Sequence, residues 1–273
     1  MLFMCLLAAC SSAPKRPAEV FTVRNVAETQ LDLANKEVER GNYEKALIML
    51  DEVKRLAISV DSPDILVREA LIRGNVRYYL GDEAEATQLW DGARFEAERA
   101  GETELAAMSR IYLERSKLLN KSADAEAVRM AVSRELSVIK KNQLYVATGW
   151  VVIGLATKET GSYADAEVAL KKALTIHQKG NYLEAAAEDW YLTASVRSVA
   201  GDAEGAVEAL RQAIAFDRRA ENSYGLAMDW RAMGDVQKKV FNVAEAASAY
   251  RRAIAIFRAM GLEQEALGVE QRL

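Results

Sequence analysis

Small and apolar residues return along this chain at an interval of about forty residues. Six alanines mark the interval, separated by 40, 41, 39, 40 and 40 positions: Ala46, Ala86, Ala127, Ala166, Ala206 and Ala246. Four positions after five of them stands a large apolar side chain: Leu50, Trp90, Leu170, Leu210 and Tyr250. Apolar residues at i and i+4, with small or apolar residues at i+7, lie on one face of a helix. Each alanine therefore marks an amphipathic helix.

A second helix precedes each of these. Trp150, Trp190 and Trp230 recur upstream, and four positions later the chain has Gly154, Ala194 and Gly234. Glycines between the two helices permit the positive φ at which a helix ends: Gly41, Gly81, Gly161 and Gly201. Small residues at a crossing let antiparallel helices approach closely. We therefore expect helical hairpins, with Ala206 and the tryptophans buried between helices.

These residues resemble the tetratricopeptide repeat. The clearest copy begins at Trp150, WVVIGLATKETGSYADAEVALKKAL, and the similarity covers residues 27–261. The period exceeds the family's 34 or so residues, and the third unit (residues 106–142) is degenerate, with Arg115 where a small residue is expected. The resemblance implies an all-α fold: a right-handed superhelical solenoid of about six hairpins, closed by a capping helix within residues 262–273.

The first residues, MLFMCLLAAC, carry no charge and are too few to span a bilayer. Leu7, Ala8, Ala9 and Cys10 match the lipobox of bacterial lipoprotein signals, although the charged segment that usually precedes it is missing. The resemblance implies cleavage before Cys10, a lipid on its thiol and, because Ser11 follows, retention at the inner leaflet of the outer membrane. We accordingly expect a signal peptide (residues 1–9), a lipidated tether (10–24) and a periplasmic solenoid (25–273).

Composition restricts the function further. Net charge is −4, which disfavours binding to a nucleic-acid backbone. The single histidine, His177, is expected at a solvated helix end, and no motif for catalysis, a cofactor or a metal site is recognisable. We expect a non-enzymatic protein without a cofactor.

The resemblance implies that the first helix of each hairpin lines a concave groove. Carrying the family's inward-facing positions onto this sequence gives candidate partner-binding residues: Asn35, Arg68, Asn75, Tyr78, Tyr79, Tyr112, Ser116, Tyr191, Ser195, Arg231 and Asp235. Amides, hydroxyls and aromatic rings on successive helices suit an extended peptide, while the tyrosines could equally pack between helices. Leu31 and Leu71 stand where chaperone-binding relatives have a lysine, so a chaperone C-terminus is not expected to bind.

Two functions agree with these observations. One is a membrane-anchored scaffold that binds a protein partner in an envelope assembly or secretion complex. The other is an accessory component of periplasmic small-ligand uptake, which would need an enclosed apolar pocket instead of a groove. The sequence favours the scaffold, because it shows no apolar cluster beyond the repeat, and it leaves homo-oligomerisation open.

Overall fold

The computed structural model describes residues 22–273, and this part of the chain forms thirteen α-helices and no strand. Their bounds are α1 Thr22–Glu39, α2 Tyr43–Ser59, α3 Pro63–Tyr79, α4 Glu83–Ala100, α5 Thr103–Leu119, α6 Ala125–Val138, α7 Gln143–Glu159, α8 Tyr163–Lys179, α9 Leu183–Ala200, α10 Ala203–Ala220, α11 Ser223–Lys239, α12 Val243–Ala259 and α13 Glu263–Glu270. Helix α1 thus begins at Thr22, slightly before residue 25, where the sequence analysis placed the start of the solenoid. Across residues 22–273, no helix combines the length and hydropathy that a bilayer-spanning segment needs.

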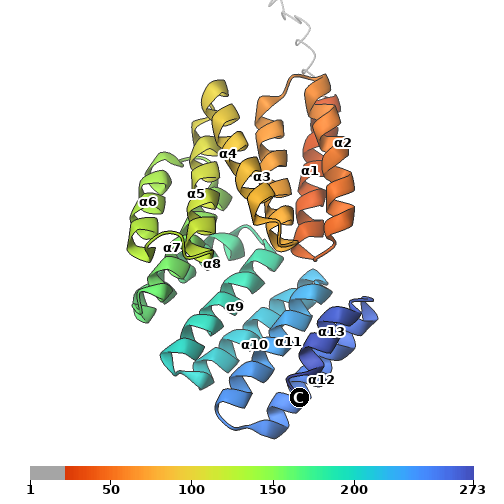
Figure 1. The fold of residues 1–273 in the computed structure, drawn as a ribbon, viewed down its shortest axis with the longest axis vertical. Helices are drawn as coiled ribbons and strands as arrows, with labels where there is room; N and C mark the ends of the chain where they lie inside the picture. The colour runs from red at the N-terminus through yellow and green to blue at the C-terminus, as the bar shows by residue number, and fades with distance from the viewer. Residues whose placement is uncertain (1–21) are drawn as a thin grey trace, which may run out of the picture.

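The helices pack as antiparallel hairpins that stack in chain order (Figure 1). Six pairs run from α1–α2 to α11–α12, and the short helix α13 packs on α12. Buried apolar clusters continue from one hairpin to the next, so each hairpin covers a face that its neighbour would otherwise expose. The expected all-α solenoid with a C-terminal capping helix is confirmed. We call the first helix of each hairpin A and the second B.

The helices of a hairpin cross at small residues, as expected. Ala206 is fully buried. At Gly74 an added Cβ would lie 2.3 Å from Nε1 of Trp90, and at Gly234 it would lie 2.4 Å from Cε1 of Tyr250. A glycine therefore occurs in these two hairpins because the B helix presents an aromatic ring to it.

The tryptophans of the later A helices are less enclosed than the pattern suggested. Trp150, Trp190 and Trp230 are half-buried. The Nζ of Lys172 lies 3.7 Å from the ring centroid of Trp150, and Arg252 lies 4.5 Å from that of Trp230. Each of these two rings therefore packs on its hairpin with one face and is covered by a cation on the other.

The third hairpin departs from the expected register by one residue. Ala127 is exposed, whereas Val128 and Val132 are buried. The reason is the turn between α5 and α6, which is longer than the other A-to-B turns and ends at Asp124, whose carboxylate accepts a hydrogen bond from the N–H of Ala127. With its cap at Asp124, α6 turns Val128 and not Ala127 toward its neighbours.

A buried pair of residues lies near the end of each B helix and in the helix that follows it, and we call this place the interhairpin slot; in the third hairpin its first residue, Ile139, comes directly after α6. From the N-terminus the pairs are Ala57/Glu69, Ala97/Ser109, Ile139/Gly149, His177/Asp189, Asp217/Asp229 and Phe257/Val269. The residues differ widely in chemistry although all are buried. Three of the slots therefore hold carboxylates that are withdrawn from water.

His177 is one of these residues, and the expectation that it lies at a solvated helix end is wrong. It is only 7% exposed, and its Nδ1 lies 2.6 Å from Oδ2 of Asp189 on the next A helix. Burial raises the pKa of Asp189 to about 6, although the nearby His177 favours the ionised carboxylate. The pair fills the slot between α8 and α9, and its residues bridge two hairpins.

Candidate functional site on the inner face

The A helices present one half-buried side chain each at a common place, and we call the surface around these residues the inner face. The residues are Asn35, Asn75, Arg115, Leu155, Ser195 and Asp235. Hydrogen bonds join inner-face residues of adjacent A helices: Asn75 Nδ2 donates to Tyr112 Oη at 3.1 Å, and Lys158 Nζ donates to Ser195 Oγ at 3.0 Å. Successive hairpins thus contribute to one continuous surface.

Arg115 takes this place in the third hairpin instead of Ser116. Ser116 is 4% exposed and therefore buried, whereas Arg115 is half-buried with its guanidinium 5.9 Å from the ring centroid of Tyr78. Counting backwards from α6 gave the wrong residue because of the long α5–α6 turn. The correct register places a cation on the inner face, which the sequence interpretation had missed.

Aromatic rings form a chain along the N-terminal part of the inner face. Tyr43 stacks on Tyr79 (centroids 5.8 Å apart), Tyr79 meets Tyr78 edge-on at 6.1 Å, and Tyr78 lies 6.0 Å from Trp90. Trp90 in turn stacks on Tyr112 at 5.6 Å. Tyr79 is 44% exposed and can meet a ligand, whereas Tyr78 and Tyr112 are half-buried and also serve packing.

The remaining candidates contribute less surface. Arg68 lies 3.6 Å from Asp32 in a partly exposed ion pair. Tyr191 packs against the buried cluster of α9 to α12, and Arg231 is half-buried. Asp235 accepts hydrogen bonds from Tyr250 and Arg272, both at 2.8 Å, so its carboxylate is used to hold the C-terminal cap.

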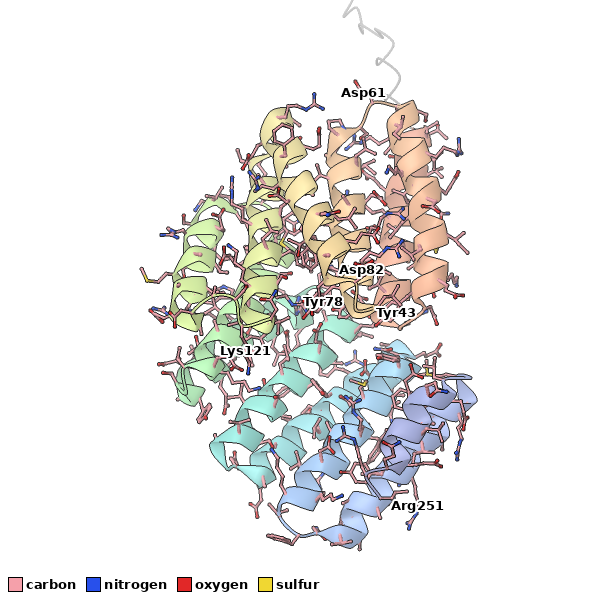
Figure 2. The ribbon with its side chains drawn as sticks, viewed as in Figure 1. Tyr43, Asp61, Tyr78, Asp82, Lys121 and Arg251 are labelled. Carbon is pink, nitrogen blue, oxygen red and sulfur yellow. The ribbon has the colours of Figure 1, made fainter. Side chains whose placement is uncertain are left out.

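The two halves of the solenoid touch across the inner face. One guanidinium nitrogen of Arg40, directly after α1, lies 3.8 Å from Glu184 and 3.4 Å from the carbonyl oxygen of Ala220. Gly41 abuts the ring of Tyr224, which an added Cβ would approach to 2.9 Å. Figure 2 shows Tyr43 and Tyr78 at this junction, below the N-terminal helices. The superhelix therefore nearly closes on itself.

Carboxylates gather beside this junction. Glu39 on α1 faces Glu184 and Glu188 on α9; its side chain is exposed, but desolvation by the surrounding protein, together with the charges of these two glutamates, raises its pKa. Glu188 also lies near Arg115. The inner face thus combines a cation, a group of carboxylates and tyrosine rings, which is a surface for polar, charged ligands.

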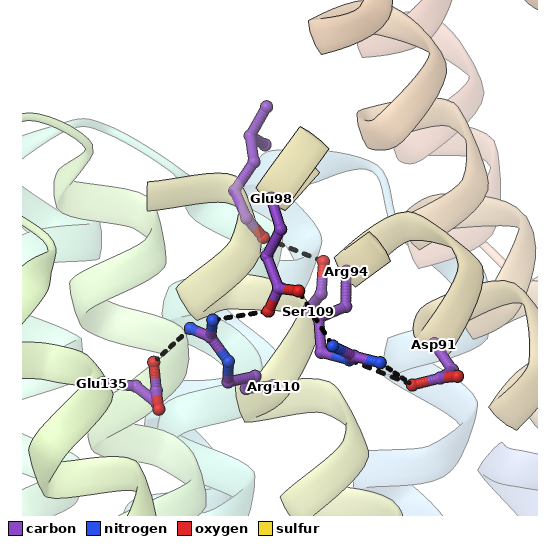
Figure 3. Close-up of polar contacts among 7 residues, drawn as sticks. Asp91, Arg94, Glu98, Ser109, Arg110 and Glu135 are labelled. Atoms are coloured by element: carbon purple, nitrogen blue, oxygen red, sulfur yellow. Dashed lines mark hydrogen bonds and ion pairs between the residues drawn. The ribbon is translucent and has the colours of Figure 1, made fainter. Parts of the chain in front are cut away.

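The outer face is hollowed on either side of α6, the shortest helix between α1 and α12. A furrow of about 570 Å³ lies between α4, α5 and α6, and one of about 390 Å³ lies between α6, α7 and α8. Ion pairs lie along the first furrow (Figure 3). Two are within α4, Asp91 with Arg94 at 2.9 Å and Arg94 with Glu98 at 3.0 Å, and two link α5 to its neighbours, Arg110 with Glu98 at 2.7 Å and Arg110 with Glu135 at 3.0 Å. The charges of this furrow largely neutralise one another.

Nothing in the described residues suggests a metal centre. Within residues 22–273, no three histidine, cysteine, aspartate or glutamate side chains are grouped so that they could hold a metal ion. The buried His177–Asp189 pair lies in an interhairpin slot, and among residues 22–273 no serine or cysteine nucleophile is hydrogen-bonded to the imidazole. The geometry around these groups is that of packing.

Comparisons with known proteins place the fold. No family model and no curated protein matches the chain. Among solved structures it is similar to BtubC (BKLC) from P. vanneervenii, with 19% identity, a TM-score of 0.57, and 86% of this chain and 92% of that chain covered. It is also similar to aspartyl phosphate phosphatase F from Bacillus subtilis (10% identity, TM-score 0.62, 92% and 79% covered). A further match is the Rap conjugation gene regulator of the plasmid pLS20, in complex with the Phr* peptide (15%, 0.57, 91% and 78%). The fold is a helical-repeat solenoid of the tetratricopeptide type.

Proposed function

We propose that this chain is a protein-interaction scaffold that binds an extended segment of a partner on the inner face of its N-terminal half. The observation that carries this proposal is a pair of polar atoms. Asn75 Oδ1 and Arg115 Nε lie on successive A helices, are buried, and have no hydrogen-bond partner within residues 22–273. One accepts and the other donates, and both side chains are half-buried, so a rotation of each would present these atoms to an extended peptide main chain, which offers both N–H and C=O groups.

Neighbouring side chains extend this complementarity. Tyr79 offers an accessible ring beside the two polar atoms, and such rings commonly anchor peptide side chains. The charge of Arg115 suits a carboxylate of the ligand. The solved structure of the Rap regulator of pLS20, which has the same type of fold, is a complex with the Phr* peptide. These points support a peptide as the ligand.

The inner face does not match the alternative role in small-ligand uptake. An apolar ligand would need an apolar pocket, whereas the inner face carries Glu39, Glu188 and Arg115. The charged junction between Arg40 and Glu184 adds to this polar character. We therefore keep the scaffold as the proposed function.

Peptides selected from a random display library on the purified protein provide the test. We expect Tyr79→Ala and Arg115→Ala each to weaken the selected peptide by about tenfold or more in calorimetric titrations. Met130→Ala, on the exposed outer side of α6, is the matched control and should bind as the parent protein does. Peptides whose affinity is indifferent to both inner-face changes would overturn the proposal. Melting curves of each variant separate lost binding from lost folding.

We also propose that the scaffold works in the bacterial envelope, anchored through a lipid on Cys10, in an assembly or secretion complex. Cys10 and the expected signal peptide lie outside the described residues. The support for this proposal is therefore the lipobox match in the sequence. The full-length protein should partition into the detergent phase of a phase-separation assay, and Cys10→Ala should stay in the aqueous phase. Equal partitioning of the two proteins would contradict the anchor while leaving the inner-face proposal intact.

A further inference from the structure

The turn between α11 and α12 carries an exposed apolar cluster, which we call the tip: Val240, Phe241 and Val243. Phe241 is 90% exposed, Val243 69% and Val240 49%. Single exposed apolar residues are common on protein surfaces. Three within four positions at one turn, led by an almost fully exposed aromatic ring, are instead the composition of a binding anchor. In Figure 1 this turn lies at the bottom of the molecule.

Phe241 also has an unfavourable backbone conformation. Its φ is +60°, in the left-handed region, where the equivalent turns mostly have glycine: Gly41, Gly81, Gly161 and Gly201. A bulky L-residue is disfavoured there because its Cβ crowds the backbone. Packing within the described residues does not compensate, since the ring is almost wholly exposed. The side chain therefore lowers the stability of the turn, and contacts of its ring with residues 22–273 do not offset this loss.

Two lysines give the tip a positive rim. Lys238 Nζ donates to the carbonyl oxygen of Arg272 at 2.7 Å, and Lys239 Nζ donates to Ser198 Oγ at 3.0 Å. Within residues 22–273, no carboxylate forms an ion pair with either ammonium group, although Glu245 lies in the first turn of α12. The charges of both lysines are therefore available to a partner.

We propose that the tip is a second interaction surface, which inserts Phe241 into an apolar pocket, rimmed by carboxylates, on a protein partner. An aromatic ring in a pocket surrounded by charge pairs is a common arrangement of interface hot spots. The tip lies on a different part of the molecule from Tyr79 and Arg115, so this binding is independent of the inner face. The solenoid would then connect two partners.

A bilayer could also receive a phenylalanine flanked by lysines, but the molecule favours a protein. The chain has a net charge of −4, which weakens attraction to an anionic membrane surface. The tip also lies at the opposite end of the long axis from the start of α1 (Figure 1). If the chain is tethered through its N-terminal residues, the tip is directed away from the membrane.

The first experiment tests the strain. Lys121 is the matched control, because it has φ +56° at the equivalent turn between α5 and α6 (labelled in Figure 2) and carries no apolar cluster. Phe241→Gly and Lys121→Gly should each raise the melting temperature by about 2–4 °C, because glycine adopts this conformation freely. A Phe241→Gly protein that melts at or below the parent temperature would contradict the claim that Phe241 is strained.

The second experiment tests the partner. The photoreactive phenylalanine analogue p-benzoylphenylalanine is placed at position 241 of the full-length chain in its own cells, and at position 121 as the control. We expect an irradiation-dependent protein adduct of defined mass at 241 only, reduced about tenfold by Lys238→Glu with Lys239→Glu. Tyr79→Ala should leave this adduct unchanged, which separates the tip from the inner face.

Several outcomes would overturn the proposal. These are no adduct at 241, a yield that does not depend on the lysine charges, an adduct with lipid, and an adduct with a second copy of this chain. With the captured protein in hand, titration completes the test. Phe241→Gly should weaken its binding by about tenfold or more, and Lys121→Gly should not change it.

Discussion

The slot between α4 and α5 and the slot between α8 and α9 lie at equivalent places two repeats apart, yet they are filled differently. The first holds Ala97 and Ser109, and Ser109 donates its hydroxyl to the carbonyl oxygen of Leu105 on its own helix at 2.8 Å (Figure 3). The second holds His177 and Asp189, which depend on each other across two helices. A small neutral pair therefore fills this place as well as a polar one does. With the polar pair, the stability of the slot also depends on the presence of both partners and on their protonation.

The largest effect should follow from removing half of the polar pair. His177→Ala leaves the Asp189 carboxylate buried without its neighbour, and breaking a buried charged pair typically costs about 3 kcal/mol of the free energy of unfolding. Urea unfolding at pH 7 measures this loss. The control is the double change His177→Ala with Asp189→Ser, which copies the α4–α5 slot and should recover most of the stability. A double variant as unstable as the single one would show that the two slots are not interchangeable.

A somewhat smaller effect is expected at the next slot, where two carboxylates are buried. Burial raises the pKa of Asp229 to about 9, aided by the charge of Asp217; burial, with the charges of Glu184 and Glu188, raises the pKa of Asp217 to about 7. Oδ2 of Asp229 has no hydrogen-bond partner within residues 22–273. Because both folded-state pKa values exceed those of the unfolded chain, the folded state binds more protons. Stability is therefore greatest below about pH 4 in this respect and falls as pH rises toward 9.

The substitution Asp229→Asn tests this pH dependence. It removes the buried charge while keeping the shape, so it should stabilise the protein at pH 8.5 by about 2 kcal/mol and by a smaller amount at pH 5. Melting temperatures of both proteins between pH 5 and 9 supply the measurement. Ser109→Ala, in the neutral α4–α5 slot, should lower stability by a similar amount at every pH. A difference in melting temperature between Asp229→Asn and the parent protein that does not grow as pH rises would contradict the expected sign.

The crossings inside hairpins allow a similar comparison with a smaller effect. An added Cβ at Gly74 would lie 2.3 Å from the indole of Trp90, which is held by a hydrogen bond to the carbonyl oxygen of Leu71, whereas at Gly154 it would lie 2.9 Å from Cγ and Cδ2 of Leu170. Gly74→Ala should therefore destabilise by about 1 kcal/mol net, because overpacking outweighs the gain in helix propensity. Gly154→Ala should cost less, because the side chain of Leu170 has no hydrogen bond to break and can shift more easily than the indole. Thermal melts of the two variants measure the difference, and equal values would mean that the indole can move aside.

Most of the fold could be predicted from the sequence because the repeat places small residues at the helix crossings and glycines at the turns. Ala206 and the glycine turns alone indicate hairpins at a fixed spacing, and the structure confirms them. The prediction from the sequence was wrong where extra residues change the register. The long α5–α6 turn exposes Ala127 and places Arg115, not Ser116, on the inner face. Starting the count at Glu102, the N-cap of α5, would have identified Arg115.

The candidate site was less predictable, because a helical position fixes where a side chain starts but not what it contacts. Asp235 lies at an inner-face position, yet its carboxylate accepts hydrogen bonds from Tyr250 and Arg272. The contact of Arg40 with Glu184 joins two hairpins that are far apart in sequence. It follows from the curvature of the whole stack, to which every hairpin contributes. Local periodicity contains no signal for such a contact.

The smallest expected effect is the one that tests the corrected register. Ala127→Glu should change the free energy of unfolding by less than about 0.5 kcal/mol, because the side chain is exposed and a carboxylate suits the first turn of α6. Ala206→Leu, at the position the repeat makes equivalent, should cost about 1–3 kcal/mol because it overpacks a buried crossing. Chemical unfolding of both proteins under one condition gives the comparison. If Ala127→Glu were as costly as Ala206→Leu, Ala127 would be buried at the crossing after all, and Arg115 would lose its place on the inner face.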